Sequence, residues 1–402
     1  MYELEHLGVP FNRTPRGTIA QRPFGGHTRD FGKAAIKRAC HAADHTGRVI
    51  LDTLYWETVR KGIKVYSEFQ VVDLIMKDNR VAGLVVYELA NGQVHLFHSR
   101  MVVLATGGFG KVYRTTSNCF ANSGDGVYLA YRAGIPLEDM EFVQFHPTGV
   151  YGLGILITEA ARGEGGILRN AKGERFMEKY APVIKDLAPR DMVSRAIYRE
   201  IGEGRGIDGR DFVLLDLTHL GRAKIDEKLS DISSFAKIYL GIDAAVQPIP
   251  VSPTCHYMMG GIPTNLDGQV LDQDQRAVPG LYAIGECACL SLHGANRLGC
   301  NSLLDLVVFG RRCGQKMIRD LSQVPWEAPP SHPEERTLAK IESLKAGGKG
   351  QKIHALRASL QKMMMDDCSV FRQEEGLSRA LAGVRNLQEG YKKISVRDVL
   401  AL

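Results

Sequence analysis

The stretch HGANRLGCNSLLDLVVFG, residues 293–310, decides the fold. It places one cation, Arg297, and several small residues directly before an apolar run, the composition expected where a helix begins against a ligand. Apolar residues from Leu303 to Met317 recur every three or four residues, which predicts a helix with one buried stripe. Unpaired amides in its first turn would favour negative charge. This pattern alone supports an ordinary core helix equally well.

The length, net charge and cysteine content of the chain limit the class of protein. Its 402 residues are enough for two or three domains. A formal charge of +6 without a lysine-rich run argues against nucleic acid and fits a small anionic substrate better. The eight cysteines form no C-x-x-C pair, which argues against a structural zinc site or a disulfide framework and predicts reduced thiols in a cytosol-like compartment. Without eighteen consecutive apolar residues, any membrane attachment is expected through partners.

Two strands that end in glycines indicate a cofactor-binding α/β sheet. The first is expected over 101–105, running into Thr106, Gly107 and Gly108, and the second over 280–284. Buried strands that end in this way lie where open α/β sheets bind their cofactors. The elements expected before them are helices over 33–46 and up to residue 60, followed by a three-stranded meander over 64–75, 81–87 and 93–97. A linker is expected over 246–253, and helices beyond residue 325.

Polar blocks without periodicity occupy the middle of the chain, which usually means a site or a solvated loop. In order they are QFHPTG (144–149), TE (158–159), RGEGG (162–166), PRD (189–191), HYMMGG (256–261) and HGANRL (293–298). Taken together, these blocks resemble the succinate dehydrogenase flavoprotein family over nearly the whole chain. Fumarate reductase and L-aspartate oxidase share several of them, but HYMMGGIPT (256–264) and NSLLDLVVFG (301–310) look most like the succinate enzymes. Cys300 stands where the family is expected to have a glycine or another small residue, and because cysteine is small we expect little damage from the change.

The resemblance implies a set of substrate contacts and catalytic residues. Succinate is a dianion, and a water-poor cleft must offer it cations and hydrogen-bond donors at both ends. The implied substrate contacts are His146, Thr158, His256 and Arg297. By the same resemblance Arg190 accepts the proton during succinate oxidation, with Glu159 and Arg162 as a relay. Because an arginine pKa lies above about 12, Arg190 could instead be only a carboxylate clamp.

The resemblance also implies FAD as the cofactor. The implied binding residues are Ala105, Thr106, Gly107, Gly108, Asp125, Glu286, Arg297, Ser302 and Leu303. The helix that begins near Ser302 would aim its positive end at the flavin and raise its potential. The G-x-G-x-x-G turn and the flavin-carrying histidine of the family have no counterpart in this sequence, so we expect a chain truncated at both ends.

The expected fold is a mixed α/β FAD-binding domain of Rossmann type without its first βαβ unit. Its two parts are placed at 1–139 and 258–321, with a capping domain over 140–257 between them and an incomplete helical region over 322–402. The expected activity is the oxidation of succinate to fumarate, with electrons passing to an iron–sulfur subunit and through it to membrane anchor subunits. The complex would lie on the cytoplasmic face of a bacterial inner membrane or on the matrix side of mitochondria. The alternatives are a fumarate reductase subunit, or a non-catalytic fragment that binds no flavin.

Overall fold

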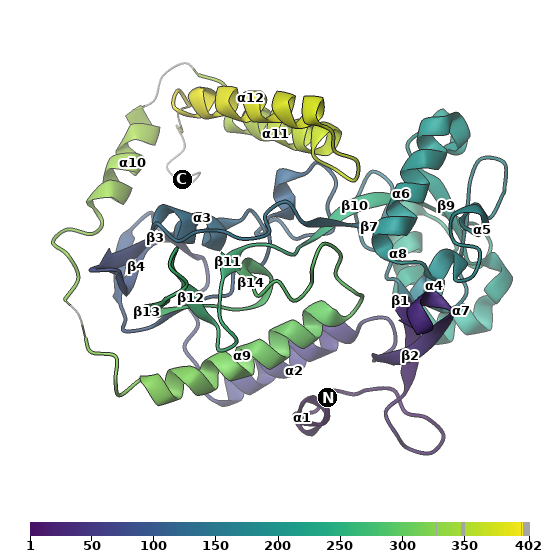
Figure 1. The fold of residues 1–402 in the computed structure, drawn as a ribbon, viewed down its shortest axis with the longest axis horizontal. Coiled ribbons are helices and arrows are strands. Elements are labelled where there is room, and N and C mark those ends of the chain that lie inside the picture. Colours follow the sequence, from purple (N-terminus) through teal and green to yellow (C-terminus); the bar gives the residue numbers. More distant parts are fainter. Residues whose placement is uncertain (327, 347–349, 395, 397–402) are drawn as a thin grey trace.

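A parallel pair of buried strands forms the base of the cofactor half of the molecule. β6 (Val102–Leu104) lies beside β13 (Ala277–Ala283) with Val103 opposite Tyr282. The two segments are far apart in the sequence, and both were predicted from their run into glycines. The computed structural model describes residues 1–326, 328–346, 350–394 and 396, and Figure 1 shows the arrangement of its elements.

The remaining elements fall into two bodies and a helical appendage. The helices are α1 (Tyr2–His6), α2 (Thr46–Arg60), α3 (Asp125–Arg132), α4 (Ala160–Gly163), α5 (Met177–Tyr180), α6 (Arg190–Glu200), α7 (Arg222–Lys228), α8 (Ser230–Leu240), α9 (Asn301–Asp320), α10 (Glu335–Ala346), α11 (Ile353–Asp367) and α12 (Glu374–Tyr391). The other strands are β1 (Gln21–Arg29), β2 (Ala34–Cys40), β3 (Phe69–Lys77), β4 (Arg80–Glu88), β5 (Val94–His98), β7 (Val143–Val150), β8 (Ile167–Arg169), β9 (Val213–Asp216), β10 (Ile249–Met258), β11 (Ile262–Pro263), β12 (Gln269–Leu271) and β14 (Ala288–Cys289).

Each body has a hydrophobic core of its own. One core lies around β6, β13 and α3, and the meander β3-β4-β5 packs against it. The meander was predicted correctly, although β3 begins at Phe69 rather than at residue 64. The second core is formed by residues of the four-stranded sheet β7-β10-β9-β8 and of the helices α4 to α8. This second body lies at the right of Figure 1.

Two stretches fold differently from the prediction. Residues 33–46, expected as a helix, contain strand β2, which pairs antiparallel with β1. Alanines there favour a helix locally, but pairing with β1 and burial of Ala39 in the second core decide the conformation. The expected linker over 246–253 is a strand from residue 249 onward, the first half of β10, because Ile249 and Val251 are buried where β10 pairs with β7 and β9.

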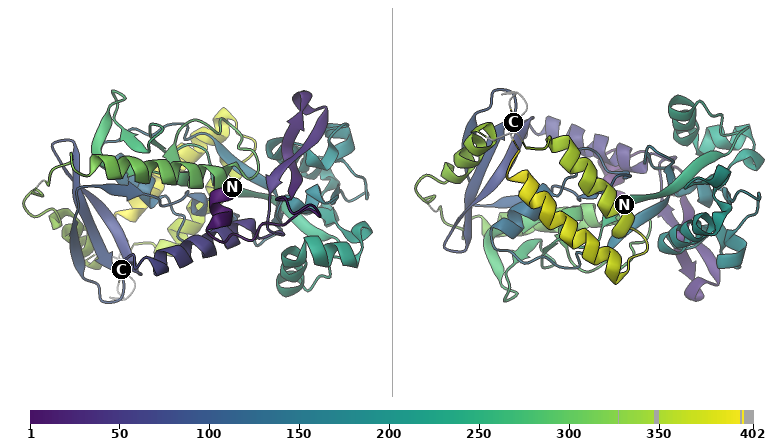
Figure 2. Two further views of the ribbon diagram at one scale, coloured as in Figure 1. Left: turned by 90° about the horizontal axis from the view of Figure 1, so that it is seen from below. Right: turned by 90° about the horizontal axis from the view of Figure 1, so that it is seen from above.

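Helix α9 begins where predicted, but its apolar stripe is not fully buried. Along it only Asp305 and Cys313 are fully buried, among the residues that the structure describes. Leu303 and Val307 instead line a cavity of about 770 Å³ shared with α2, and the two helices stand apart in the left panel of Figure 2. The periodicity therefore predicted the helix correctly, but the stripe is only partly buried: Leu303 and Val307 pack against the cluster of Leu4, Val9, Phe11 and Ile50.

The C-terminal helices were predicted as an appendage. α11 and α12 pack side by side across one face of the cofactor half, as Figures 1 and 2 show. Gln361 of α11 donates a hydrogen bond to the carbonyl of Lys111 over 2.9 Å, which ties the pair to the body beneath. Within the described ranges, no helix combines the length and the apolar character that a membrane crossing requires.

Candidate active site

Two buried histidines face each other from neighbouring strands. His146 lies on β7 and His256 on β10, and their ring centroids are 5.2 Å apart. Cys255 of β10 pairs with Phe145 of β7, and Tyr257 pairs with the neighbouring Gln144. His256 has no partner of its own in this pairing and is therefore the extra residue of a β-bulge. A bulge re-aims a side chain beside a site. Ser117 fixes the ring further, because its hydroxyl lies 2.7 Å from His256 Nδ1.

A buried ion-pair network links three residues of the predicted catalytic set. Arg190, the first residue of α6, donates from Nε to Glu159 Oε2 over 3.0 Å. Arg162 Nη2 donates to the other oxygen of Glu159 over 2.8 Å, and Arg162 Nη1 donates to the carbonyl of Asp186. The side chains of Glu159 and Arg162 are entirely inaccessible to solvent. The spacing of the PRD and TE blocks gave no indication of these contacts.

Gln144 contacts the predicted site residues, although the sequence analysis did not name it as one of them. Its Oε1 accepts a hydrogen bond from Arg190 Nη1 over 3.0 Å, and its Nε2 donates to the carbonyl of Arg297 over 2.6 Å. Gln144 therefore joins the start of α6 to the loop before α9. The residue stands in the QFHPTG block directly before the predicted His146, so its position on a buried strand was the available signal.

The electrostatics of the cluster favour an anion. Burial, followed by the charge of Arg190, lowers the pKa of His146 and of His256 well below the usual range, so both rings are neutral at pH 7. Burial would raise the pKa of Glu159, but Arg190 and Arg162 outweigh it and keep the carboxylate ionised. Burial also lowers the pKa of Arg297 to about 10, which leaves this guanidinium charged.

Polar atoms remain free in this cluster. Nε2 of His146 and Nε of Arg297 are buried and have no hydrogen-bond partner among the described residues. Arg297 lies over the ring of Tyr257, with 4.3 Å from its guanidinium carbon to the ring centroid. Thr158 is half-buried, and its hydroxyl accepts a hydrogen bond from the amide of Ala160 over 3.3 Å. Free buried donors are costly unless a ligand occupies them.

A cavity of about 220 Å³ brings the substrate and cofactor candidates together. It is lined by Ser117, Asn118, Leu156, His256, Tyr257, Glu286, Arg297, Ser302 and Leu306. Of the predicted set, His256, Arg297, Glu286 and Ser302 lie on this wall. The rest of the predicted substrate and catalytic set lies outside this lining: His146, Thr158, Glu159, Arg162 and Arg190. His146 adjoins the cavity through its ring contact with His256, and Leu303 lines the larger cavity.

Glu286 and Gly108 meet at the ends of the two parallel strands. Oε1 of Glu286 accepts a hydrogen bond from the amide of Met258 over 3.0 Å. A Cβ on Gly108 would lie 2.4 Å from that oxygen, so only glycine fits there. Burial raises the pKa of Glu286 to about 7, so this carboxyl can hold a proton and donate a hydrogen bond.

The other cofactor candidates lie around the end of β6. Ala105 and Thr106 are exposed although they follow a buried strand, and Gly107 is half-buried. Asp125, the first residue of α3, makes no capping hydrogen bond with its side chain. Its carboxylate accepts instead from Gln70 over 3.2 Å and from Ser123 over 3.0 Å. The alternative of a simple helix cap is therefore not what the structure shows.

The start of α9 carries local strain at Cys300. This residue has φ +68° and ψ −16°, in the left-handed region that favours glycine. Its backbone position is the N-cap of the helix, whose first residues, Asn301 and Ser302, face the two cavities. Of the small residues expected at position 300, glycine is the one that this backbone conformation favours.

Comparison with known proteins places the chain in a family. A family profile described as an FAD binding domain matches residues 1–303, and one described as the fumarate reductase flavoprotein C-terminal region matches residues 357–400. The succinate dehydrogenase flavoprotein subunit of Rickettsia felis is 48% identical over 98% of this chain and 68% of that protein. The chain therefore belongs to the succinate dehydrogenase and fumarate reductase flavoprotein family. The predicted family is confirmed.

Other members of the flavoprotein family agree with this assignment. The mitochondrial succinate dehydrogenase flavoprotein subunit of Oryza sativa is 44% identical over 98% of this chain and 64% of that protein. A solved structure of E. coli quinol fumarate reductase covers 100% of this chain and 70% of its own at a TM-score of 0.90 and 36% identity. The mixed α/β fold class is confirmed. The assignment to a family of FAD-dependent oxidoreductases is confirmed as well. Within this family, the succinate dehydrogenase subunits named here have a higher sequence identity to this chain than the fumarate reductase structure has.

The residues of this flavoprotein fit part of an FAD molecule. A hydroxyl, Ser302, stands at the positive end of the 20-residue helix α9 and faces a cavity. Gly108 has no side chain, so the space beside the Glu286 carboxylate stays open. The exposed turn at Ala105 and Thr106 lies at the carboxyl end of a buried strand. A flavin ring requires polar donors, backbone that can approach it closely and an apolar wall, which Leu306 provides here.

Proposed function

We propose that this chain oxidises succinate to fumarate as the flavoprotein subunit of a succinate dehydrogenase. The observation that carries the proposal is the charge of the buried cluster. Three guanidinium groups, those of Arg162, Arg190 and Arg297, surround the single ionised carboxylate of Glu159. This leaves an excess of two positive charges beside the cavity, and a four-carbon dicarboxylate supplies two negative ones.

The substrate contacts follow from which donors are free. Arg297 and His256 reach the cavity wall, and the buried Nε2 of His146 lies behind His256 with no partner in the part of the chain that the structure describes. Thr158 offers a hydroxyl beside the Glu159 network. Because both histidines are neutral, each can donate one hydrogen bond to a substrate carboxylate without adding charge.

Arg190 is the group proposed to accept the proton removed from succinate. Its hydrogen bonds to Glu159 Oε2 and Gln144 Oε1, both 3.0 Å long, hold the guanidinium in one plane. In this step Arg190 gives one N–H proton to Glu159 Oε2 as it takes the proton from the substrate carbon, so that the guanidinium stays charged and Glu159 becomes protonated; Arg162 is next in the network. The same geometry also suits a clamp that only positions the substrate carboxylate, so the two roles need a direct test.

FAD, when bound, accepts the hydride from the neighbouring methylene carbon of the substrate. The residues proposed to hold it are Ala105, Thr106, Gly107, Gly108, Asp125, Glu286, Arg297, Ser302 and Leu303. The N-terminal end of α9 favours negative charge near Ser302. Protonated Glu286 can donate to an acceptor while leaving the amide of Met258 satisfied.

The division into domains is part of this proposal. The second hydrophobic core supports a capping domain over 140–257 between two parts of an FAD-binding domain at 1–139 and 258–321, followed by a helical region over 322–402. Phe24 of β1 and Ala39 of β2 are buried in the core of the cap, so that ribbon would move with it. Closure of the cap would exclude water and hold Arg190 against the substrate.

The relatives are named as subunits, which supports partner chains for this one. The proposed partners are an iron–sulfur subunit that takes the electrons and, through it, membrane anchor subunits. The relatives include bacterial and mitochondrial proteins. We place the complex on the cytoplasmic face of a bacterial inner membrane or on the matrix side of the mitochondrial one.

A flavin-binding and ligand-perturbation experiment tests the proposal. The purified chain is incubated with FAD and desalted, and its visible spectrum is recorded with and without malonate, a non-reactive dicarboxylate. A retained flavin whose spectrum responds to malonate but not to acetate, together with dye reduction by succinate, supports the proposal. A chain that retains no flavin is the non-catalytic alternative, and turnover with fumarate alone would favour a fumarate reductase.

A further inference from the structure

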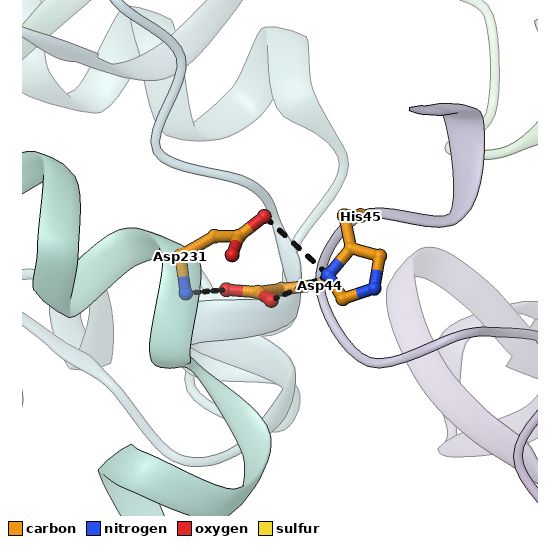
Figure 3. Close-up of side chains that lie close together, drawn as sticks. All are labelled: Asp44, His45 and Asp231. Atoms are coloured by element: carbon orange, nitrogen blue, oxygen red, sulfur yellow. Dashed lines mark hydrogen bonds and ion pairs between the residues drawn. The ribbon is translucent and has the colours of Figure 1, made fainter. Parts of the chain in front are cut away.

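Three potential metal ligands converge outside the proposed active site. Asp44 and His45 stand directly before α2, and Asp231 is the second residue of α8 in the proposed capping domain. Figure 3 shows the imidazole of His45 pointing toward both carboxylates. The distance from His45 Nδ1 is 3.6 Å to Asp44 Oδ1 and 3.4 Å to Asp231 Oδ2. One ligand atom from each residue lies within 4.8 Å of the other two.

Two of these ligand atoms are buried and unsatisfied. The side chain of Asp44 is 0% exposed, and its Oδ2 accepts hydrogen bonds from the amides of Asp231 and Ile232 over 3.1 and 3.2 Å. The other oxygen, Oδ1, forms no hydrogen bond with any described residue, and neither does Nδ1 of His45. A buried carboxylate oxygen that faces an imidazole nitrogen without a hydrogen bond is satisfied either by a metal cation between the two or by a proton on the imidazole.

The spacing fits a tetrahedral metal ion. Zinc binds carboxylate oxygen and imidazole nitrogen at about 2.0–2.1 Å, and a tetrahedron with such bonds has edges of roughly 3.3 Å. The two measured contacts, 3.4 and 3.6 Å, are close to that edge. The amides of α8 also hold Asp44 from its far oxygen, in the way that outer contacts orient a metal ligand. We propose that Asp44, His45 and Asp231 bind a zinc ion or a similar divalent transition metal, with water completing the coordination.

The charge of the cluster supports the same conclusion. Among the described residues, the ion pairs of Asp44 and of Asp231 are both with His45. A dication would neutralise the two carboxylates of Asp44 and Asp231. The sequence pattern predicted no metal, because the ligands are separated by almost two hundred residues and none is a cysteine.

The proposed ion would join two parts of the molecule. Asp44 and His45 belong to the segment that leads into α2, and Asp231 belongs to the first turn of α8. A shared metal would therefore add a cross-link between the cofactor half and the cap. Metal binding would resist any movement of α8 away from α2.

Cobalt provides a direct test, because Co²⁺ replaces zinc and reports its own ligands. The full chain is freed of metal with a chelator and titrated with CoCl₂. We expect one Co²⁺ per chain with visible d–d absorption but without a near-ultraviolet thiolate band, which separates this site from free cysteines. Zinc should displace the cobalt. The variants His45→Gln and Asp231→Asn should each weaken binding at least tenfold, since each removes one of three ligands.

A matched control comes from another histidine–carboxylate pair. His95 lies 2.7 Å from Glu88, and no third potential ligand among the described residues joins this pair, so His95→Gln should leave cobalt binding unchanged. Far-ultraviolet circular dichroism checks that all three variants fold. Asp44→Asn is avoided because Asp44 also holds the first turn of α8. Cobalt binding that is absent, or equal in wild type and in the folded His45→Gln and Asp231→Asn variants, would overturn the proposal. A protonated histidine between two carboxylates would then account for the geometry.

Discussion

Arg190 and Glu159 form a buried ion pair in which both Nε and Nη2 of the arginine lie 3.0 Å from one carboxylate oxygen. The other oxygen of Glu159 is occupied by Arg162. One carboxylate thus serves two guanidinium groups, and neither pair is exposed. Arg190 keeps a small exposed fraction whereas Arg162 has none, so we propose Arg190 as the member of the network that meets the substrate.

Replacing Arg190 by lysine tests its role as the proton acceptor. Lysine keeps the charge but not the two-point contact with Glu159 and Gln144. If Arg190 carries the proton, kcat should fall by roughly 10²–10⁴-fold while the Kd for malonate changes less than about tenfold. Steady-state kinetics and a malonate titration of the flavin spectrum measure the two. A loss confined to binding would identify Arg190 as a clamp.

Glu159→Gln is expected to destabilise the fold. The change leaves Arg162 and Arg190 buried without a counter-charge, which costs about 3–5 kcal/mol. Glu178→Gln is the matched control, because Glu178 is exposed and pairs with Lys185 at the surface over 2.7 Å. That variant should leave the free energy of unfolding nearly unchanged, because solvent screens the surface pair. Urea unfolding followed by circular dichroism compares them, and equal effects would contradict the importance of burial.

Glu286 should make the flavin-free chain less stable as the pH rises. Its pKa is about 7 in the folded chain because of burial, against the usual 4.5. Between these values the unfolded chain has lost the proton that the folded chain keeps, so folding loses free energy with increasing pH. Glu286→Gln stays neutral, and should gain about 2–3 kcal/mol relative to wild type between pH 5 and pH 8. Urea unfolding at both pH values measures the gain, and a constant difference would be against it.

Cys300 should prefer glycine over alanine, against the usual order in helices. At φ +68° a Cβ costs about 1–2 kcal/mol, and glycine avoids it. We expect Cys300→Gly to be more stable than Cys300→Ala by about 1 kcal/mol. The control pair is Gln315→Gly and Gln315→Ala on the same helix, where alanine should be better by about 1 kcal/mol. Thermal unfolding compares both pairs, and the same order at both positions would show that the strain has no effect.

Ser302→Asp should lower the reduction potential of bound flavin. A new negative charge at the first turn of α9 opposes the positive end of the helix and disfavours the reduced anion. A change of about 1.4 kcal/mol corresponds to roughly 30 mV for two electrons. Redox titration should find a decrease of at least that size, and Ser302→Asn, which adds no charge, should show a smaller one. An unchanged potential in Ser302→Asp would argue against this helix as a flavin contact.

The sequence predicted the parts of the fold that depend mainly on neighbouring residues. The glycine-ended strands, the meander and the start of α9 each carry a period or a turn signal, and each is present. Strand β2 was missed because its alanines favour a helix and only pairing with β1 makes it a strand. The apolar stripe of α9 was assigned to a core, since the sequence does not show that Leu303 and Val307 line a cavity.

Within the site, residue types were easier to predict than contacts. The ordered blocks pointed to His146, Arg190 and their neighbours, which stay predictions as functional residues. Gln144 was passed over, because an uncharged amide on a strand gives no chemical signal until both of its hydrogen bonds are seen. The cluster of Asp44, His45 and Asp231 was invisible for a related reason, since only the folded chain brings α2 and α8 together.

Strand β10 has a mechanical consequence. It runs through the sheet of the cap and ends at Met258, where the backbone amide is held by Glu286. The bulge that turns His256 lies close to that end. A rotation of the proposed capping domain would therefore bend the chain close to His256. Substrate contact by His256 and closure of the domain would then be coupled through one strand.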